Sequence, residues 1–272
     1  MKLLEKIILL LDHQMTEPSL FGWFHLLWLG ITAAAVFLAC RFGPKASKRQ
    51  VDRIVLITAI VVAILEVYKQ INYTFSVGEN GITADYHWYA FPFQFCSTPM
   101  YVGLLAGIFR KGKFNECLCS YLATFAVFAG LAVSIYPGDV FVETTGINIQ
   151  TMICHGSMIP LGTLLFASGR GSINYRTVLK ACCVFVVTLS IACVLNEVAY
   201  SVGLLENHNF NMFYISRHLD STLPVFSLVQ PLVPFPVSFI IYVVGFTAAA
   251  YLMMLLHKLM LRNRAKTLVA TH

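Results

Sequence analysis

The sequence has few charged residues for its length. Only 12% of its 272 residues are Asp, Glu, Lys or Arg, whereas a soluble globular domain carries about a quarter. Hydrophobic residues make up 58% of the chain, and the mean hydropathy is +0.73. So few charges cannot cover a surface that faces water, and lipid must therefore solvate much of it. The composition excludes a soluble protein and predicts a polytopic membrane protein.

Metal-binding and disulfide motifs are also missing. Eight cysteines are present, but no CxxC pair has a downstream partner, and the spacing of Cys117 and Cys119 is too tight for a zinc knuckle. Most of the cysteines lie within or close to apolar segments, where cysteine acts as a small hydrophobic residue. No spacing motif supports a metal site formed by His25, His155 and a carboxylate. We therefore expect no disulfide framework, no metal and no cofactor.

The N-terminus lacks the features of a cleaved signal peptide. Its apolar run is short, charged residues interrupt it, and no small-residue cleavage site follows. Its apolar residues recur at helical spacing, which is typical of a helix at a membrane surface and also of an ordinary helical turn at a chain end. We expect residues 1–14 to be retained as an interfacial helix, and residues 1–272 to form a single integral membrane domain.

Several apolar segments are long enough to cross a membrane as helices. A hydrocarbon core of about 30 Å needs about 20 mostly apolar residues in a helix. Prolines at positions 92, 99 and 160 interrupt two of these segments, which a spanning helix tolerates where neighbouring groups satisfy the freed backbone. The sequence predicts an all-α transmembrane helix bundle with about seven spans: 20–40, 54–74, 89–109, 117–136, 150–168, 178–203 and 236–260.

Lysine and arginine residues gather on one side of this seven-span arrangement. Five lie at 41–53, three at 110–113, three at 170–180 and four at 258–266, which together are 15 of the 19 in the chain. Cytoplasmic loops carry an excess of such residues. We therefore expect the N-terminus outside, the C-terminus in the cytoplasm, and a basic cytoplasmic tail at 261–272. This placement accounts for the net charge of +6, which does not indicate a nucleic-acid partner.

The connection between the last two spans, 204–235, is the only long one on the outside. Its second half is rich in proline and apolar residues. Such a composition is typical of a segment that lies on the membrane surface or dips into it.

Polar residues within the predicted spans fall at one depth. Ionisable groups in the hydrocarbon region are costly, so they usually face the bundle interior and serve a function. With the orientation above, five spans place such residues in the outer part of the membrane, and the inner halves contain nothing comparable. We expect one polar pocket that opens toward the outside face, formed by His25, Glu66, Lys69, Gln94, Cys96, His155, Asn196 and Glu197.

Most of these residues also have an ordinary structural explanation. Glu66 and Lys69 are three residues apart on one helix face, where they neutralise each other if they pair. His25 and Asn196 suit interhelical hydrogen bonds. Glu197 has no partner on its own helix, and Lys69 is the candidate for that role.

Cys96 alone is typical of a small core residue, but a histidine at matching depth changes its interpretation. Cysteine becomes a nucleophile when a base or a positive potential stabilises its thiolate. Pro92 suits the first turn of a helix, which predicts Cys96 in the second turn, near the positive end of the helix dipole. His155, on another span, is the candidate base.

The other polar residues supply candidates for the remaining roles of such a site. Gln94 or Asn196 would donate to an oxyanion. Glu66 or Glu197 would orient His155. These assignments follow from the common depth of the residues alone.

Five short motifs within residues 20–260 resemble a known family. They are FHLLWL in the first span, LEVYKQ in the second, FPFQFCSTPMY in the third, ICHGSM in the fifth and NHNFNMF after the sixth. The pattern resembles the bacterial YwaF-like integral membrane proteins, which are similar to a eukaryotic multi-pass phospholipid acyltransferase and, more distantly, to the androgen-induced hydrolases of fatty-acid esters. The resemblance implies acyl chemistry, with a cysteine or threonine nucleophile and a histidine on a later span. Cys96 and His155 stand at the matching positions, and Thr98 is an alternative nucleophile.

The favoured function is a lipid acyltransferase or lipid-ester hydrolase of the bacterial cytoplasmic membrane that works through a thioester on Cys96. Membrane lipids are the expected partners, as acyl donor or acceptor, and the sequence indicates no oligomeric state. The main alternative is a small-ligand or proton-coupled transporter or receptor that uses Glu66, Lys69, His155 and Glu197. No inverted repeat is visible, which counts against a transporter. A structural or assembly factor without turnover is the third possibility.

Overall fold

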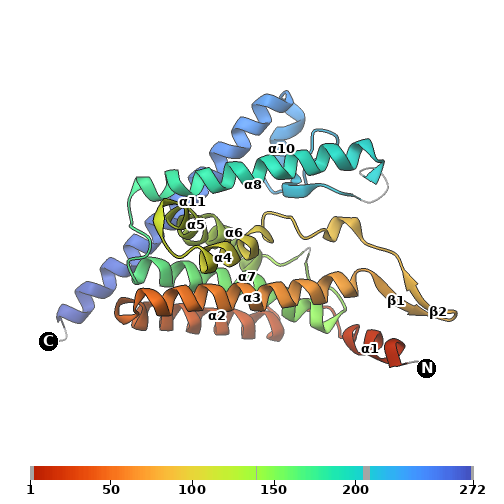
Figure 1. Ribbon diagram of the computed structural model, residues 1–272, viewed down its shortest axis with the longest axis horizontal. Helices are drawn as coiled ribbons and strands as arrows, with labels where there is room; N and C mark the ends of the chain where they lie inside the picture. Colours follow the sequence, from red (N-terminus) through yellow and green to blue (C-terminus); the bar gives the residue numbers. More distant parts are fainter. Residues whose placement is uncertain (1–2, 139, 205–208, 271–272) are drawn as a thin grey trace.

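A computed structural model describes residues 3–138, 140–204 and 209–270, with the side chains of the last helix described up to Arg262. Within these residues one small hairpin accompanies a helical bundle (Figure 1). The hairpin pairs β1 (Phe75–Gly78) with the antiparallel strand β2 (Gly81–Ala84). The helices are α1 (Leu3–Leu11), α2 (Trp23–Phe42), α3 (Lys48–Asn72), α4 (Thr98–Ile108), α5 (Gly112–Ala123), α6 (Phe125–Ile135), α7 (Thr145–Ala167), α8 (Tyr175–Ser201), α10 (Phe226–Val229) and α11 (Phe235–Ala270), with 3₁₀ turns η1 (Gly43–Lys45), η2 (Trp88–Ala90), η3 (Met212–Tyr214) and η4 (Gln230–Leu232).

Six helical segments in the described part of the chain are long and apolar enough to cross a membrane. Each of them overlaps one of the predicted spans. Their bounds are Trp23–Lys45, Lys48–Asn72, Gly112–Ile135, Thr145–Ala167, Tyr175–Ser201 and Phe235–Arg262. The prediction of a helical protein with several candidate membrane spans is confirmed.

The third predicted span is not one long helix. Its one α-helix is α4, whose 11 residues rise about 16 Å, against a hydrocarbon core of about 30 Å. Phe91 is extended, with φ −48° and ψ 133°, as a residue before proline prefers. The helix begins at Thr98 with Pro99 in its first turn, so the prediction of a helix starting at Pro92 is wrong. Cys96 therefore lies in the turn before α4 and not in a second helical turn.

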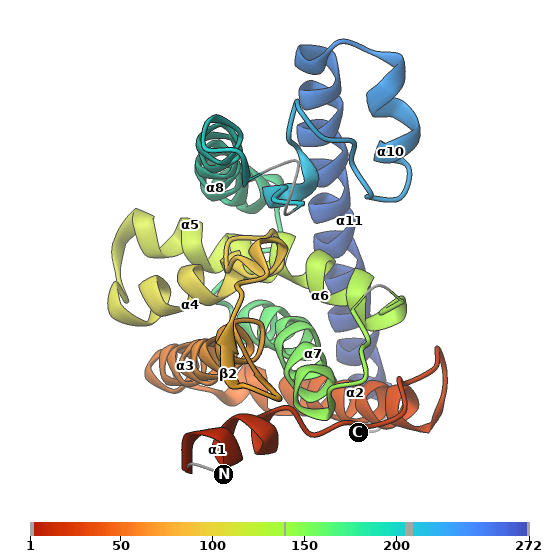
Figure 2. The same cartoon turned by 90° about the vertical axis from the view of Figure 1, so that its right-hand side faces the viewer.

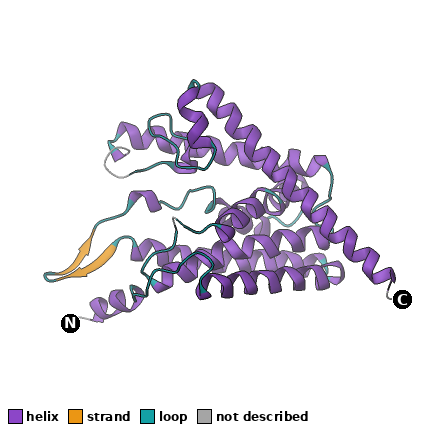
Figure 3. Ribbon diagram, turned by 180° about the vertical axis from the view of Figure 1, so that it is seen from behind, coloured by secondary structure: helices purple, strands orange, loops and turns teal. Residues whose placement is uncertain are grey.

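The two ends of the bundle differ in their connections (Figures 1 and 3). The α2–α3, α4–α5 and α7–α8 connections lie at the same end as the C-terminus, whereas the N-terminus and the hairpin lie at the other end. The three connections carry the basic clusters at 41–53, 110–113 and 170–180. The basic residues therefore belong to one end of the bundle, called the basic end below.

Helix α7 lies at the centre of the bundle, packed against α2, α3 and α6 (Figure 2). A second group of contacts joins α5 to α4 and α8. The core between these helices is rich in aromatic residues, and the rings of Phe125 and Phe185 stack with their centroids 4.5 Å apart. Thr124 leaves the helical conformation, with φ −128° and ψ −75°, and separates α5 from α6. Helix α6 then packs against both α7 and α11.

The connection between α8 and α11 folds back onto the bundle. We name residues 209–226 the strap; it contains η3 and leads into α10. Four of its residues have a φ between 51° and 68°, a left-handed conformation that is strained for residues other than glycine. They are Asn209, Phe213, Tyr214 and Val225. Side chains from the bundle hold the strap in this conformation, as described below.

Both chain ends are helical as far as they are described. Helix α1 exposes Leu3, Leu4 and Leu10, as a helix at a membrane surface does. The hydroxyl of Tyr68 on α3 donates to the carbonyl oxygen of Leu11 over 2.7 Å and ties α1 to the bundle. At the other end, α11 continues to Ala270, so most of the predicted tail at 261–272 extends this helix.

Candidate functional site

Cys96 and His155 line the same cavity, which has a volume of about 390 Å³. The cavity lies among α6, α7, α11, the strap and the turn before α4. Its walls are mainly aromatic and aliphatic, and Gln94 is one of the few polar residues in them. The lining side chains include Phe95, Phe128, Ala129, Ala132, Val133, Phe213, Tyr214, Phe226, Tyr242 and Phe246.

The turn before α4 places Cys96 at this cavity and turns Thr98 away from it. Cys96 is followed by Ser97, the N-cap residue of α4, so the thiol lies on the N-terminal side of that helix. The hydroxyl of Thr98 is fully buried and bonds to the carbonyl oxygen of Phe95 at 2.9 Å and to the hydroxyl of Tyr121 at 2.6 Å. Of the two candidate nucleophiles, Cys96 is the one that lines the cavity.

His155 has one bonded and one unbonded ring nitrogen. Its Nδ1 lies 2.8 Å from the backbone carbonyl oxygen of Thr151 on the same helix. A carbonyl oxygen can only accept, so Nδ1 carries the hydrogen and the neutral ring has its lone pair on Nε2. Nε2 is buried and has no hydrogen-bond partner within the part of the chain that the structure describes. A general base requires an unprotonated nitrogen of this kind, with a lone pair that is free to accept a proton.

Close helix packing fixes the backbone of His155. A Cβ atom added to Gly130 on α6 would lie 2.5 Å from the carbonyl oxygen of His155. Real Cβ contacts are not that short, so only glycine allows α6 to approach α7 at this point.

Gln94 and Asn196 hold the strap by paired hydrogen bonds. Gln94 donates from Nε2 to the carbonyl oxygen of Asn211 at 3.0 Å and accepts at Oε1 from the backbone N–H of Phe213 at 2.9 Å. Asn196 donates to the carbonyl oxygen of Met212 at 3.0 Å and accepts from its N–H at 2.7 Å. Gln94 also lines the cavity, whereas Asn196 is buried behind the strap and does not.

Glu66 and Lys69 form an ion pair on α3, which agrees with the structural explanation given for them in the sequence analysis. Lys69 Nζ lies 2.7 Å from Glu66 Oε1, and Gln70 donates to the same oxygen at 2.7 Å. Gln70 in turn accepts from the hydroxyl of Tyr86 at 2.5 Å. Tyr86 lies outside the membrane-spanning helices, and burial raises its pKa to about 12, so its hydroxyl stays protonated and remains a donor.

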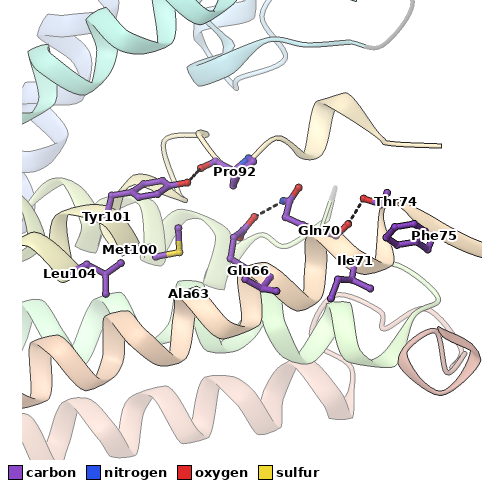
Figure 4. Close-up of a pocket in the computed structure, with 11 residues that line it drawn as sticks. Ala63, Glu66, Gln70, Ile71, Thr74, Phe75, Pro92, Met100, Tyr101 and Leu104 are labelled. Atoms are coloured by element: carbon purple, nitrogen blue, oxygen red, sulfur yellow. Dashed lines mark hydrogen bonds between the residues drawn. The ribbon is translucent and has the colours of Figure 1, made fainter. Parts of the chain in front are cut away.

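The same part of α3 borders a separate groove of about 430 Å³ (Figure 4). Glu66 and Gln70 lie on one side of it, and Pro92 and Tyr101 lie on the other. The hydroxyl of Tyr101 donates to the carbonyl oxygen of Pro92 at 2.8 Å. This groove does not include Cys96 or His155, although the charges of the ion pair are close enough to interact with the thiol of Cys96.

The two remaining predicted residues have structural partners elsewhere. Glu197 is partly exposed and pairs with Arg217 at 2.8 Å and with His218 at 3.2 Å, so Lys69 is not its partner. His25 is fully buried; it accepts at Nδ1 from the N–H of Phe21 at 3.0 Å and donates from Nε2 to the carbonyl oxygen of Ser134 at 2.8 Å.

The eight predicted residues therefore do not line one polar pocket. The structure brings Gln94, Cys96 and His155 to a mainly apolar cavity and distributes the others over four places. His155 is oriented by a backbone carbonyl group and not by Glu66 or Glu197. Among the described residues, no group of three or more His, Cys, Asp or Glu side chains is placed to hold a metal ion.

Sequence reasoning missed the aromatic residues that shape the cavity. Tyr242 and Phe246 come from α11, and Phe213 comes from the strap. The hydroxyl of Tyr242 donates to the carbonyl oxygen of Phe213 at 2.8 Å and joins these two walls. The only available signal was that Tyr242 and Phe246 are four residues apart, which places them on one face of a helix. Of the motif NHNFNMF, Asn207 and His208 lie outside the described residues.

A comparison with known protein families finds a match over most of the chain. The model of a family described as the TMEM164 family, a family of multi-pass membrane proteins, matches residues 20–256. The match covers both Cys96 and His155 and all six candidate membrane-spanning segments except the last residues of α11. No curated protein and no solved structure matches the chain significantly.

Proposed function

We propose that this chain, which belongs to the TMEM164 family, is an intramembrane lipid acyltransferase or lipid-ester hydrolase. Cys96 is the nucleophile and His155 the general base. One observation carries the proposal: Cys96 and His155 line one mainly apolar cavity, and Nε2 of His155 has no partner among the described residues. A cysteine nucleophile needs a base with an unprotonated nitrogen. The hydrogen bond to Thr151 keeps the hydrogen of His155 on Nδ1 and so leaves Nε2 unprotonated.

In the first step, the Cys96 thiol attacks the carbonyl carbon of an acyl ester. Nε2 of His155 takes the thiol proton as the new C–S bond forms. When the tetrahedral intermediate collapses, the C–O bond breaks and His155 returns the proton to the departing alcohol oxygen. The product of this step is a thioester on Cys96 and a free alcohol.

In the second step, a hydroxyl group attacks the thioester. His155 removes the proton from the attacking oxygen, the C–S bond breaks, and the proton returns to the sulfur. If the hydroxyl belongs to a second lipid, the net reaction is acyl transfer, and if it belongs to water, the reaction is ester hydrolysis. No redox partner and no cofactor enters this balance.

Gln94 is the candidate donor to the negative oxygen of the intermediate. Its amide nitrogen carries two hydrogens, and one of them is bonded to the carbonyl oxygen of Asn211. Because Gln94 also lines the cavity, we assign the second hydrogen to the oxyanion. Asn196 takes no part in this step, because both of its amide atoms are bonded to Met212 behind the strap.

The cavity suits an acyl chain better than a polar ligand. Its volume is within the usual range of ligand pockets, which is about 300–1,000 Å³, and its walls are mainly aromatic and aliphatic. The transporter alternative needs Glu66, Lys69, His155 and Glu197 around one pathway. The first two form a separate ion pair and Glu197 pairs at the surface, so this alternative has less support.

The proposal also includes the topology from the sequence. Helix α4 and the non-helical segment before it would form a seventh crossing between the hairpin end and the basic end. The basic end would face the cytoplasm of a bacterial cell and the N-terminus would face outward.

Labelling with an acyl-ester activity probe tests the function. Purified wild-type protein is expected to form a covalent adduct, and Cys96→Ala and His155→Ala are expected to lose it. Thr98→Val is the matched control, because its hydroxyl is buried against Tyr121 outside the cavity. Labelling of Cys96→Ala and His155→Ala at the wild-type level would disprove the proposal, and loss of labelling only in Thr98→Val would move the nucleophile to Thr98.

A further inference from the structure

A second groove lies at the basic end of the bundle, and Cys96 does not line it. It consists of two adjoining parts of about 300 Å³ and about 450 Å³, which share Phe42 and Ile54 as lining residues. None of the residues that line these two parts lines the cavity of Cys96. We name the pair of parts the basic-end groove.

The first part of the basic-end groove is an apolar trough between α2 and α3. Both helices pack against α7, which forms the floor. Leu38 of α2 and Ile54 of α3 form the walls, and Leu161 and Leu164 of α7 lie below them. Such a trough on the lipid-facing side of the bundle accepts a hydrocarbon chain without burying any charge.

The second part adds cationic side chains at the end of the trough. Its lining includes Lys45 from η1 and Arg53 from the second turn of α3, with the amide of Gln50 between them in the sequence. Lys45 and Arg53 are exposed, and neither forms an ion pair with a carboxylate in the described part of the chain. Asp52, the acidic residue next to Arg53, bonds instead to Arg170.

We propose that the basic-end groove binds one anionic phospholipid. The phosphate of the headgroup lies at Lys45 and Arg53, where two cations face no anion of the protein, and one acyl chain lies in the trough beside Leu38 and Ile54. Arginine and lysine together suit phosphate oxygens, and basic pockets between helices at a membrane surface bind lipid headgroups in this way. The joined apolar and cationic parts distinguish this ligand from free phosphate and from a zwitterionic lipid.

Native mass spectrometry of the full-length protein tests the proposal. Protein stripped of lipid is titrated with dioleoylphosphatidylglycerol or with dioleoylphosphatidylcholine. The wild-type protein is expected to retain one phosphatidylglycerol molecule in preference to phosphatidylcholine. Lys45→Gln/Arg53→Gln is expected to bind phosphatidylglycerol about 30-fold more weakly, because each lost charge near the headgroup lowers the affinity.

Two further variants distinguish binding at the groove from an effect of the overall positive charge and from misfolding. Lys113→Gln/Arg176→Gln removes one lysine and one arginine from the same end of the bundle, outside the groove, and is expected to retain the wild-type affinity. Ala35→Trp fills the trough and keeps both cations, and it is expected to weaken binding as well. Equal affinity for the two lipids in the wild type, or equal losses in the two double variants, would overturn the proposal.

Discussion

His155 donates the hydrogen on Nδ1 to the carbonyl oxygen of Thr151, one helical turn before it, over 2.8 Å. This bond leaves the lone pair on Nε2, which is buried and has no partner among the described residues, and His155 lines the cavity that Cys96 also lines. His25 is also buried, but both of its ring nitrogens are bonded. The two histidines therefore differ in what their removal is expected to do.

Replacement of the two histidines is expected to separate chemistry from stability. His155→Ala removes the proposed base, and the rate of acyl-probe labelling is expected to fall by a factor of about 10² to 10⁴. His25→Ala leaves the N–H of Phe21 and the carbonyl oxygen of Ser134 without their partner, and the folded state is expected to lose about 1–2 kcal/mol. Thermal unfolding and labelling rate, measured on both variants, check this. Equal losses of labelling per folded molecule would contradict it.

Gly130→Ala is expected to slow labelling without touching either reacting side chain. The added Cβ would lie 2.5 Å from the carbonyl oxygen of His155, so α6 and α7 must move apart and the imidazole must shift. A shift of the imidazole by about 1 Å is expected to lower the labelling rate about 10- to 100-fold. Gly30→Ala on α2 is the matched control, because its Cβ would meet no atom within 4 Å. A Gly130→Ala protein that labels as fast as Gly30→Ala would argue against a fixed position for His155.

Asn196→Leu is expected to loosen the strap. The substitution removes the two hydrogen bonds to the backbone of Met212, whose N–H and carbonyl groups are buried. Leaving such groups unpaired costs about 1–3 kcal/mol, which corresponds to amide exchange about 5- to 150-fold faster at Met212. Hydrogen–deuterium exchange measures this directly. Ser190→Ala, on the same helix, is the control, because its hydroxyl bonds only to Val186 within α8; unchanged exchange at Met212 in Asn196→Leu would refute the anchoring role.

Ala132→Phe is expected to change which acyl chains the cavity accepts. Ala132 lines the cavity on α6 and is exposed at its edge, so a phenyl ring there fills part of the volume. Labelling by a long-chain probe is expected to fall about tenfold relative to a short-chain probe. Ala248→Phe on α11 is the control, because Ala248 is exposed but does not line the cavity. An unchanged ratio in Ala132→Phe would mean that the acyl chain lies elsewhere.

Local sequence properties were sufficient to predict the long helices. The apolar length of each segment and the placement of basic residues are properties of neighbouring residues, and six of the predicted spans correspond to long helices. The third predicted span does not correspond to a long helix. Pro92 and Pro99 restrict the backbone around Cys96, so the helix begins only at Thr98. The prolines were visible in the sequence, but their effect depends on whether neighbouring groups satisfy the freed backbone.

The partners of the polar residues could not be predicted in the same way. His25 and His155 look alike in the sequence, and only the positions of Thr151 and Ser134 show that one has a free nitrogen. The strap also depends on distant contacts, because Gln94 reaches Phe213 across 119 positions of the chain. The common depth predicted from the sequence does not determine which of these residues contact one another.

The most direct test of the central claim is the mass of the peptide that contains Cys96 after the wild-type protein has been incubated with an acyl-ester lipid and digested. The proposed mechanism predicts that this peptide gains the mass of one acyl group, that hydroxylamine removes it, and that His155→Ala prevents its formation. An unmodified Cys96 peptide under conditions in which the lipid ester is consumed would contradict the mechanism.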